Sequence, residues 1–514
     1  MRSYTIRRPR TNGAHNMSAP KSYATHSAVL RGVEALPVTV EVSVSNTIPG
    51  ITIVGLGDTA IAEARIRVRS AIRQSGFKLP RVHYTVNLAP SELKKTGTGL
   101  DLAIAVGILV CSGQIPTDGL DGCLFVGELG LGGNVSAVRG LVAYDMLARE
   151  QSLTLVSANC TYPGGSVVRI CDNLGHLSYG IKELPTPRLS EGEELSAEPE
   201  EFEDFAEVVD QEMAKRAFVI AAAGNHGMMM VGPPGAGKSM MAKRMPGILS
   251  KLSDDERAEA MLIHSVAGQS LDMLRAGNRP FRAPHHAISL AGMVGGGRPV
   301  TPGEISLAHR GVLFLDEIPE FGPSVLQALR QPMEDGVVRI VRADGGYVFP
   351  SEFMLVAAAN PCPCGYLGDP DHVCTCAPAR IKSYQSRIGG PLMDRIDVLV
   401  DVTRPSPSRI ILGERGTSST QMATAVRKAR EFSSWRRRDK GAEVGRSKGG
   451  VADQGLDAGA KATLDGIARR LGLGGRNIVR IARVARTIAD LEESSLVHKD
   501  HIVEACAFRT RASL

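Results

Sequence analysis

The segment VGPPGAGKSM, residues 231–240, decides the fold class of this chain of 514 residues. It contains the pattern G-x-x-x-x-G-K-S, follows an apolar run and precedes a stretch of helix-forming residues. A glycine-rich turn between a buried strand and a helix directs backbone N–H groups toward phosphate oxygens. The segment therefore predicts a P-loop that binds ATP together with Mg²⁺ in an α/β domain.

Each residue type in this segment has an expected contact with the nucleotide. Lys238 is expected to neutralise the β- and γ-phosphates, and the Ser239 hydroxyl is expected to bind Mg²⁺. The backbone of the remaining residues is expected to surround the phosphates: Gly232, Pro233, Pro234, Gly235, Ala236 and Gly237.

Two further apolar runs end in polar residues. The run GVLFLDEIPEF, residues 311–321, places Asp316 and Glu317 at a strand end, where Asp316 would hold Mg²⁺ and Glu317 would activate the attacking water. The run FMLVAAAN ends in Asn360, which is expected to contact the γ-phosphate or that water. An acidic turn and a polar cap would be the alternatives without the P-loop. Together these strand ends predict an ATPase of the AAA+ type.

An arginine in GPLMDRIDVLV, residues 390–400, is a candidate for a contact between subunits. Arg395 precedes another apolar strand, where a permanent cation suits an arginine finger acting on a neighbouring subunit's ATP. A local ion pair with Asp394 or Asp397 is the alternative.

A second arginine opens the basic helical segment RNIVRIARVAR. Arg476 is the candidate for a sensor that reaches ATP within its own chain. Arg480 and Arg483 share a helix face with it and compete for that role.

Composition and patterning predict several regions and no membrane segment. No run approaches the ~18 apolar residues that span a bilayer, and no signal peptide is recognisable, so we expect a cytoplasmic protein. The net charge of +6 is mild, so contacts with nucleic acid would depend on local patches. The expected division is a disordered extension at 1–20, an α+β domain at 21–182, an acidic linker at 183–204, an α/β core at 205–403, and an all-α domain at 404–514 with a basic glycine-rich loop near 433–455.

Several longer motifs carry a family resemblance. RPFRAPHHAIS, GGGRPVTPGEISLAHRGVLFLDEIPEF, NPCPCG, GPLMDRID and RVARTIADL resemble the ComM/YifB family of magnesium-chelatase-like AAA+ ATPases, and the resemblance extends from about residue 22 to the C-terminus. It implies a homo-hexameric ring with Arg395 as the finger and Asn360 as the first sensor. It also implies a cytoplasmic motor on branched or single-stranded DNA, a helicase that promotes branch migration during homologous recombination.

Two segments are candidates for the DNA contact. VVRIVRADGGYVFP, residues 337–350, predicts a hairpin that carries Arg339 and Arg342, and the family's structural class directs such a hairpin into the pore. An ordinary solvated hairpin is the alternative. Residues 281–302 resemble the family's other insertion and offer Arg282 and Arg298. The adjacent residues at 285 and 286 are histidines, which we expect to pack in the loop rather than bind a metal.

The N-terminal domain resembles the Lon protease-like (S5-like) fold. Gly99 occupies the position of the Lon serine, and Val142 that of the catalytic lysine, so the Ser–Lys dyad is missing. An ATP-dependent protease is therefore disfavoured, and oligomerisation or a DNA contact is the expected role. Lys94, Lys95 and the arginines of the segment ARIRVRSAIR are the candidates for such a contact, with an ordinary solvated helix face as the default alternative. A magnesium-chelatase-like motor subunit that remodels a protein partner is the other alternative to the DNA motor.

Four cysteines follow Asn360 in the segment NPCPCGYLGDPDHVCTC. Their spacing suits a structural tetrahedral Zn²⁺ site, although reduced thiols and a redox pair stay open as alternatives. A closed site of four thiolates has no open position, so it would not present metal to a substrate. The four candidates are Cys362, Cys364, Cys374 and Cys376, with Asp369, Asp371 and His372 as alternative ligands.

Overall fold

The computed structural model describes residues 20–159, 166–187, 202–343, 345–439 and 450–509. Contacts divide the chain into two compact units, Met1–Glu191 and Gly192–Leu514. The expected extension at 1–20 lies outside the described residues except for its last residue, as does most of the expected acidic linker. Within the described ranges, no helix is both long and apolar enough to cross a bilayer.

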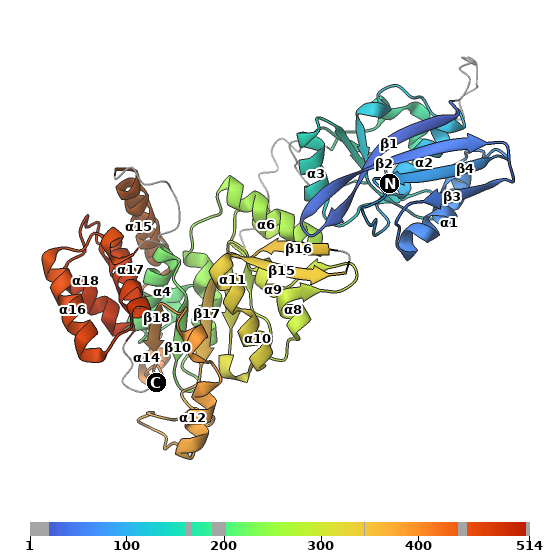
Figure 1. The fold of residues 1–514 in the computed structure, drawn as a ribbon. Helices are drawn as coiled ribbons and strands as arrows, with labels where there is room; N and C mark the ends of the chain where they lie inside the picture. Colours follow the sequence, from blue (N-terminus) through green and yellow to red (C-terminus); the bar gives the residue numbers. More distant parts are fainter. Residues whose placement is uncertain (1–19, 160–165, 188–201, 344, 440–449, 510–514) are drawn as a thin grey trace. The chain divides into compact units, whose positions relative to one another are not determined.

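The N-terminal unit is a seven-stranded mixed sheet with the order β3-β4-β2-β1-β5-β8-β9 (Figure 1). Helix α2 is buried at every residue, because every residue after Asp101 is apolar or glycine and Asp101 is paired with Arg67. The elements are β1 (Ser22–Arg31), β2 (Glu34–Ser45), β3 (Gly50–Val54), α1 (Thr59–Gln74), β4 (His83–Ala89), α2 (Asp101–Cys111), β5 (Cys123–Phe125), β6 (Glu128–Leu129), β7 (Val135–Ser136), α3 (Leu141–Glu150), β8 (Thr154–Ser157) and β9 (Val168–Ile170).

The second unit contains a five-stranded parallel sheet with the order β11-β14-β17-β10-β18. Strands β10, β14 and β17 are buried at every position, as expected for a parallel sheet covered on both faces. Because all strands run in one direction, their carboxyl ends meet at one edge. The strands are β10 (Met228–Val231), β11 (Phe281–Arg282), β14 (Val312–Leu315), β17 (Met354–Ala359) and β18 (Val398–Asp401).

Helices and two short antiparallel pairs surround this sheet. Strands β12 (Gly295–Gly296) and β13 (Thr301–Pro302) form one pair, and β15 (Val337–Arg342) and β16 (Gly345–Pro350) form the other. The second pair confirms the predicted hairpin. The helices are α4 (Glu212–Gly224), α5 (Lys238–Arg244), α6 (Asp254–Ala267), α7 (Asp272–Arg275), α8 (Leu290–Val294), α9 (Glu304–Leu307), α10 (Pro323–Ala328), α11 (Arg330–Asp335), α12 (Pro378–Ser386) and α13 (Gly390–Met393).

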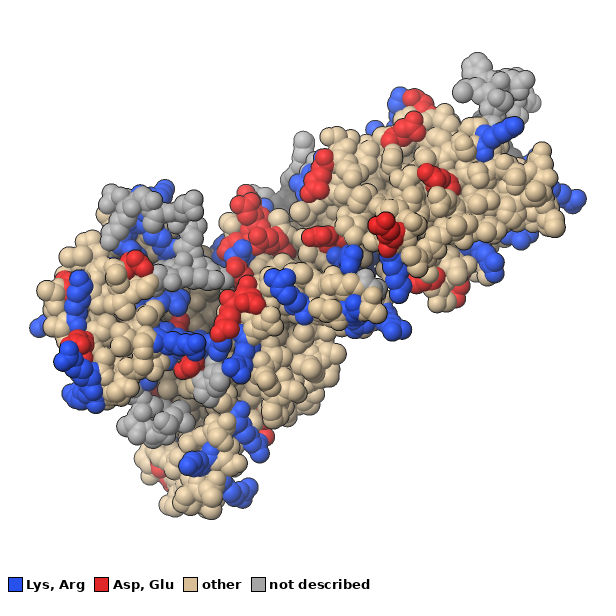
Figure 2. All heavy atoms as spheres, in the orientation of Figure 1, with Lys and Arg blue, Asp and Glu red and all other residues tan. Residues whose placement is uncertain are grey.

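The C-terminal region is helical, so the predicted fold class of an α/β core with an α+β N-terminal domain and an all-α C-terminal domain is confirmed. On the face shown in Figure 2, basic and acidic side chains are mixed over this unit rather than gathered into one basic surface. The helices are α14 (Pro407–Ile411), α15 (Ser419–Asp439), α16 (Ala458–Leu471), α17 (Gly475–Leu491) and α18 (Lys499–Ala507).

The structure differs from the expected basic loop near 433–455 at both ends. Helix α15 continues to Asp439, a short 3-10 helix spans Val451–Gln454, and residues 440–449 lie outside the described ranges. Arg436 explains the continuation, because its Nε and Nη2 atoms donate to the two carboxylate oxygens of Asp490 at 3.0 Å, and both side chains are buried. This bidentate pair fixes the last turns of α15 on helix α17.

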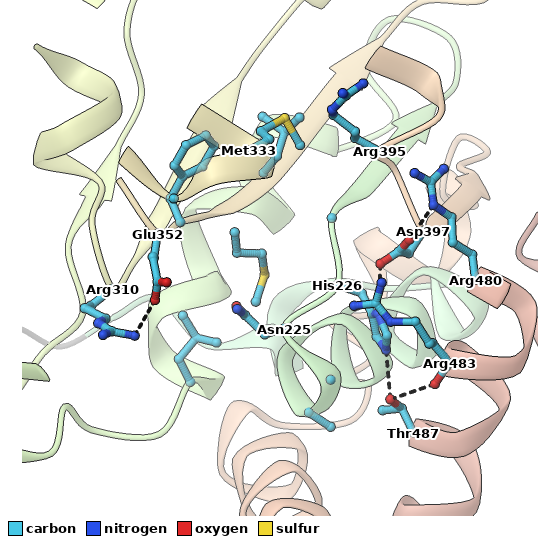
Figure 3. Close-up of a pocket in the computed structure, with 18 of the residues that line it drawn as sticks. Asn225, His226, Arg310, Met333, Glu352, Arg395, Asp397, Arg480, Arg483 and Thr487 are labelled. Atoms are coloured by element: carbon cyan, nitrogen blue, oxygen red, sulfur yellow. Dashed lines mark hydrogen bonds and ion pairs between the residues drawn. The ribbon is translucent and has the colours of Figure 1, made fainter. Parts of the chain in front are cut away.

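A buried hydrogen-bonded chain joins the helical region to the core sheet (Figure 3). His226, just before β10, lies 3.1 Å from Asp397 through Nδ1 and 2.8 Å from Thr487 of α17 through Nε2. Gly224 leaves room for this arrangement, because a β-carbon there would collide with the His226 ring and the Thr487 hydroxyl.

We expect Gly224→Ala to destabilise the second unit by about 1–3 kcal/mol, because the added methyl group overpacks a buried hydrogen-bonded site. Thermal unfolding measures the change. Gly466→Ala is the matched control, since Gly466 lies in helix α16 with open space around its α-carbon. The control should gain about 0.5–1 kcal/mol from the higher helix propensity of alanine. Equal effects of the two substitutions would contradict the packing role of Gly224.

Candidate nucleotide-binding site

The P-loop connects β10 to helix α5 at the carboxyl edge of the parallel sheet. Gly235 and Gly237 both have φ of 80°, a backbone conformation that favours glycine. Lys238 is 9% exposed, and its ammonium group donates to the carbonyls of Gly232 at 2.8 Å and Pro233 at 2.9 Å. The backbone of the turn therefore surrounds the Lys238 ammonium group, which is the group expected to bind the phosphates.

The strand ends bring the predicted polar residues to this turn. Lys238 Nζ donates to Asn360 Oδ1 at 3.1 Å, and the Ser239 hydroxyl donates to Asp316 Oδ2 at 2.5 Å. These oxygens of Ser239 and Asp316 are the hard ligands that Mg²⁺ prefers. Burial lowers the pKa of Lys238, while the nearby carboxylates of Asp316 and Glu317 oppose that shift. The structure thus brings together the residues that sequence patterns assigned to ATP and Mg²⁺.

Glu317 occupies a turn directly after Asp316. Its φ is 49°, its backbone N–H donates to Asp316 Oδ1 at 3.0 Å, and its side chain is 53% exposed. The Asp316 carboxylate thus accepts hydrogen bonds from Ser239 and the Glu317 backbone, while the Glu317 carboxylate is accessible to water.

His286 also belongs to this site, and sequence reasoning missed it. Its Nδ1 lies 3.8 Å from Glu317 Oε2, and its ring meets Phe321 edge-on at 6.5 Å between centroids. Glu317 is distant from His286 in sequence, which is why no sequence pattern indicated this contact. Both histidines also pack within the loop as expected, with ring centroids 4.1 Å apart.

The arginine candidates lie at the opposite edge of the same sheet. Arg395 and Asp397 precede β18, and the backbone N–H of Asp397 donates to Gly227 O, just before β10, at 2.8 Å. Together with Arg476 and Arg480 they line a cavity of about 640 Å³ (Figure 3). The structure therefore does not bring Arg395 or Arg476 to the P-loop of their own chain.

Ion pairs within this cavity differ from those that the sequence suggested. Arg395 pairs with Glu334 of α11, whereas its expected partners Asp394 and Asp397 pair with Arg476 at 3.8 Å and Arg480 at 3.4 Å. Burial, followed by the charges of neighbouring guanidinium groups, lowers the pKa of Arg395. Arg476 is 78% exposed, and its position does not support a role at the ATP of its own chain.

Comparison with known proteins places the whole chain in one family. The family models "Subunit ChlI of Mg-chelatase", "Magnesium chelatase, subunit ChlI" and "Magnesium chelatase, subunit ChlI C-terminal" match residues 40–159, 204–410 and 416–509. Competence protein ComM of Haemophilus influenzae is 38% identical over 501 residues, which cover 95% of this chain and 97% of that protein. The chain belongs to the ComM/YifB family of magnesium-chelatase-like AAA+ proteins.

Other relatives agree with this ComM/YifB membership. Uncharacterized protein YifB of Escherichia coli is 37% identical over 496 residues, covering 94% of this chain and 96% of that protein. The Magnesium-chelatase 67 kDa subunit of Chlorobaculum tepidum is 24% identical over 227 residues, covering 42% of this chain and 30% of that protein. Family membership supports an AAA+ ATPase motor that uses ATP and Mg²⁺.

In this ComM/YifB chain the four cysteines converge. Their ligand atoms lie within 4.8 Å of one another, and the Cys362 sulfur lies 3.3 Å from that of Cys364 and 3.6 Å from that of Cys374. A hydrogen bond from the Tyr366 backbone N–H is the largest cause that lowers the pKa of the Cys364 thiol to about 6. At Cys374 and Cys376, the backbone hydrogen bonds that lower the pKa are outweighed by burial and the neighbouring sulfurs, so both pKa values are raised. The cluster can hold a thiophilic metal ion.

The four arginines suggested as DNA contacts in this ComM/YifB chain differ in exposure and in their ion pairs. Arg282 forms a bidentate ion pair with Glu304 at 2.6 and 2.7 Å, so this arginine is engaged within the chain. Arg339 is exposed on β15, whereas Arg342 lies on the other face, 3.5 Å from where a β-carbon on Gly296 would be. Arg298 is exposed in the turn between β12 and β13. Arg339 and Arg298 are therefore the available cations.

The N-terminal unit agrees with the loss of protease chemistry. Thr98, beside Gly99, donates its hydroxyl to Glu128 Oε2 at 2.7 Å rather than to a base of lysine type. Val142 is buried in helix α3. Lys95, suggested as a DNA contact, is fully buried and donates to the Pro90 carbonyl, so that suggestion was wrong. Lys94 is exposed.

Proposed function

We propose that this chain is the subunit of a homo-hexameric, ATP-driven DNA motor that moves branched or single-stranded DNA, as a helicase in branch migration during homologous recombination. The observation that carries the proposal is the separation of the P-loop from Arg395 across the sheet. In this proposal, the ATP site of one subunit is complete only when a second copy of the chain supplies Arg395. Head-to-tail contacts between identical subunits form a ring when their rotation closes, as the proposed hexamer requires.

In this proposal each residue has a defined role. Lys238 and the P-loop backbone bind the phosphates, Ser239 and Asp316 hold Mg²⁺, and Glu317 activates water beside Asn360. Arg395 contacts the ATP of the neighbouring subunit, and Arg476 joins it there because both line the same cavity. Zn²⁺ is bound by Cys362, Cys364, Cys374 and Cys376.

The hairpin β15–β16 is the proposed DNA contact. Its outer face carries Arg339 beside Val341 and Val348, which are 84% and 42% exposed. An exposed cation on such a hairpin can contact phosphates without reading base sequence, and the exposed valines beside it offer apolar contact to a strand. The mixed charge of the surrounding surface favours such a local contact (Figure 2).

Strand exchange on a preformed synthetic DNA junction tests the function. The wild-type chain should move the junction when ATP and Mg²⁺ are present, and the Glu317→Gln chain should not. If the wild type hydrolyses ATP but leaves every junction in place, the DNA part of the proposal is wrong, and stimulation of the ATPase by a protein partner becomes the next test.

We expect Arg339→Ala to weaken single-stranded DNA binding and to reduce the slope of log K against log salt by about 1, the change expected when one cation no longer meets a phosphate. Arg469→Ala is the control, because Arg469 is a similarly exposed arginine that pairs with Asp465 on helix α16. Fluorescence anisotropy over a range of salt concentrations measures both variants. Equal salt slopes for both variants would exclude Arg339 from the contact.

A further inference from the structure

The cysteine loop has no helix or strand and few buried apolar side chains to order it. Residues 361–377 lie between β17 and α12, and all of them are described without a helix or strand. Val373 and Leu367 are 88% and 37% exposed, so these apolar side chains contribute little to a core. A tetrahedral Zn²⁺ with Zn–S distances of about 2.3 Å needs sulfur atoms about 3.8 Å apart, close to the spacing found here. Metal binding would therefore add the cross-links between the two ends of this loop that its few polar and ring contacts do not supply.

This loop lies directly against the P-loop. Gly365 has φ of 86°, and a β-carbon at this position would lie 2.5 Å from Cδ of Pro234. The backbone between Cys364 and Tyr366 therefore packs on the ring of a P-loop residue. Cys362, in turn, is fully buried two residues after Asn360, whose amide oxygen accepts from Lys238.

Arg404 connects the same two segments by hydrogen bonds. Its Nε donates to the Pro234 carbonyl at 3.2 Å, and its Nη1 donates to His372 Nδ1 of the cysteine loop at 2.8 Å. The guanidinium also lies 5.4 Å from the centre of the Tyr366 ring and 3.5 Å from the Asp369 carboxylate. The Pro234 ring thus packs on the loop backbone at Gly365, and the Pro234 carbonyl is hydrogen-bonded to Arg404, which is itself hydrogen-bonded to the loop.

We propose that Zn²⁺ bound by the four cysteines sets the ATP affinity of the P-loop, because the metal-held loop forms the wall against which Pro234 rests. The proposal rests on the zinc site and the nucleotide site proposed above. Without the metal, the loop releases Pro234 and Arg404, and the P-loop spends less time in its binding-competent conformation. If that fraction falls to about a tenth, the dissociation constant for ATP rises about tenfold.

Two glycines of the loop provide a matched test that leaves the cysteines intact. Gly365 and Gly368 have φ of 86° and 78°, so alanine is similarly strained at both positions. Only Gly365 faces Pro234, whereas a β-carbon on Gly368 would meet nothing within 4 Å. Gly365→Ala should raise the dissociation constant for a fluorescent ATP analogue about tenfold with zinc retained. Gly368→Ala should bind the analogue as the wild type does.

Removing the metal tests directly whether bound Zn²⁺ sets the affinity for ATP. In the full-length chain, zinc is measured by elemental mass spectrometry and binding by titration with the ATP analogue. Cys374→Ser should lose zinc and raise the dissociation constant about tenfold, and wild-type chain stripped with a chelator should regain its affinity when Zn²⁺ is added back. Circular dichroism checks that each chain remains folded.

Three results would overturn the inference. A folded, zinc-free chain with wild-type affinity would show that the metal does not act on the P-loop. A wild-type chain that binds ATP without holding zinc would remove the inference and leave the ATPase proposal standing. A wild-type chain that holds zinc but does not bind ATP would remove both.

Discussion

Replacing Glu317 by glutamine should reduce ATP hydrolysis by about 10²- to 10⁴-fold, the usual contribution of a general base. The affinity for ATP should change little, because Lys238, Ser239 and Asp316 form their contacts without the Glu317 carboxylate. Glutamine has the size of glutamate but cannot accept the proton of the attacking water. Phosphate release under single-turnover conditions and titration with an ATP analogue measure the two effects separately.

Glu320→Gln is the control for this prediction. Glu320 lies on the same turn, with its carboxylate exposed and 3.5 Å from Arg387. An exposed pair of this kind contributes little, so its removal should leave hydrolysis near the wild-type rate. A Glu317→Gln chain that hydrolyses ATP at a comparable rate would exclude Glu317 as the base.

Replacing Arg395 by alanine should lower hydrolysis by about 10³- to 10⁵-fold, the range for arginine fingers, while each chain still binds ATP. The reason is the position of Arg395 at the sheet edge opposite the P-loop of its own chain, which in the proposed ring places it at a neighbour's ATP. Mixing subunits tests this directly. A Glu317→Gln chain still supplies Arg395 to a neighbour, and an Arg395→Ala chain still contains Glu317.

Equal mixing of these two inactive chains should therefore restore activity. In a randomly mixed ring, about a quarter of the sites combine an intact Glu317 with an intact neighbouring Arg395. Glu334→Gln is the control, because it removes the ion-pair partner of Arg395 and keeps the guanidinium. If Arg395 served only this pair, Glu334→Gln would be as harmful as Arg395→Ala, and mixing would restore nothing.

The elements near the P-loop could be predicted because their signals are local. Uninterrupted apolar runs such as MMMV and VLFL identify strands buried on both faces, and a parallel sheet brings their polar ends together. The contacts of Lys238 with Asn360 and of Ser239 with Asp316 follow from that topology.

Contacts between distant segments could not be predicted. The arginine-rich end of α15 has the composition of a loop, and only Asp490 on another helix explains why Arg436 stays helical. The neighbours of His286 and Arg395 are likewise separated from them in sequence. In contrast, the side of the hairpin on which Arg342 lies could have been predicted. Side chains alternate along a strand, so residues three apart, such as Arg339 and Arg342, point to opposite faces.

The position of β10 in its sheet has a consequence for synthesis on the ribosome. Met228 is paired with Val356 on one side and with Val398 on the other, so both neighbours of this strand emerge long after it. The backbone N–H of Leu399 in turn donates to Phe508 O near the end of the chain. A nascent chain must therefore keep an apolar strand with an open edge from aggregating from the synthesis of Val231 until that of β18. This arrangement gives chaperones a long interval in which to act, and slow translation or premature truncation would be most harmful before β18 has been made.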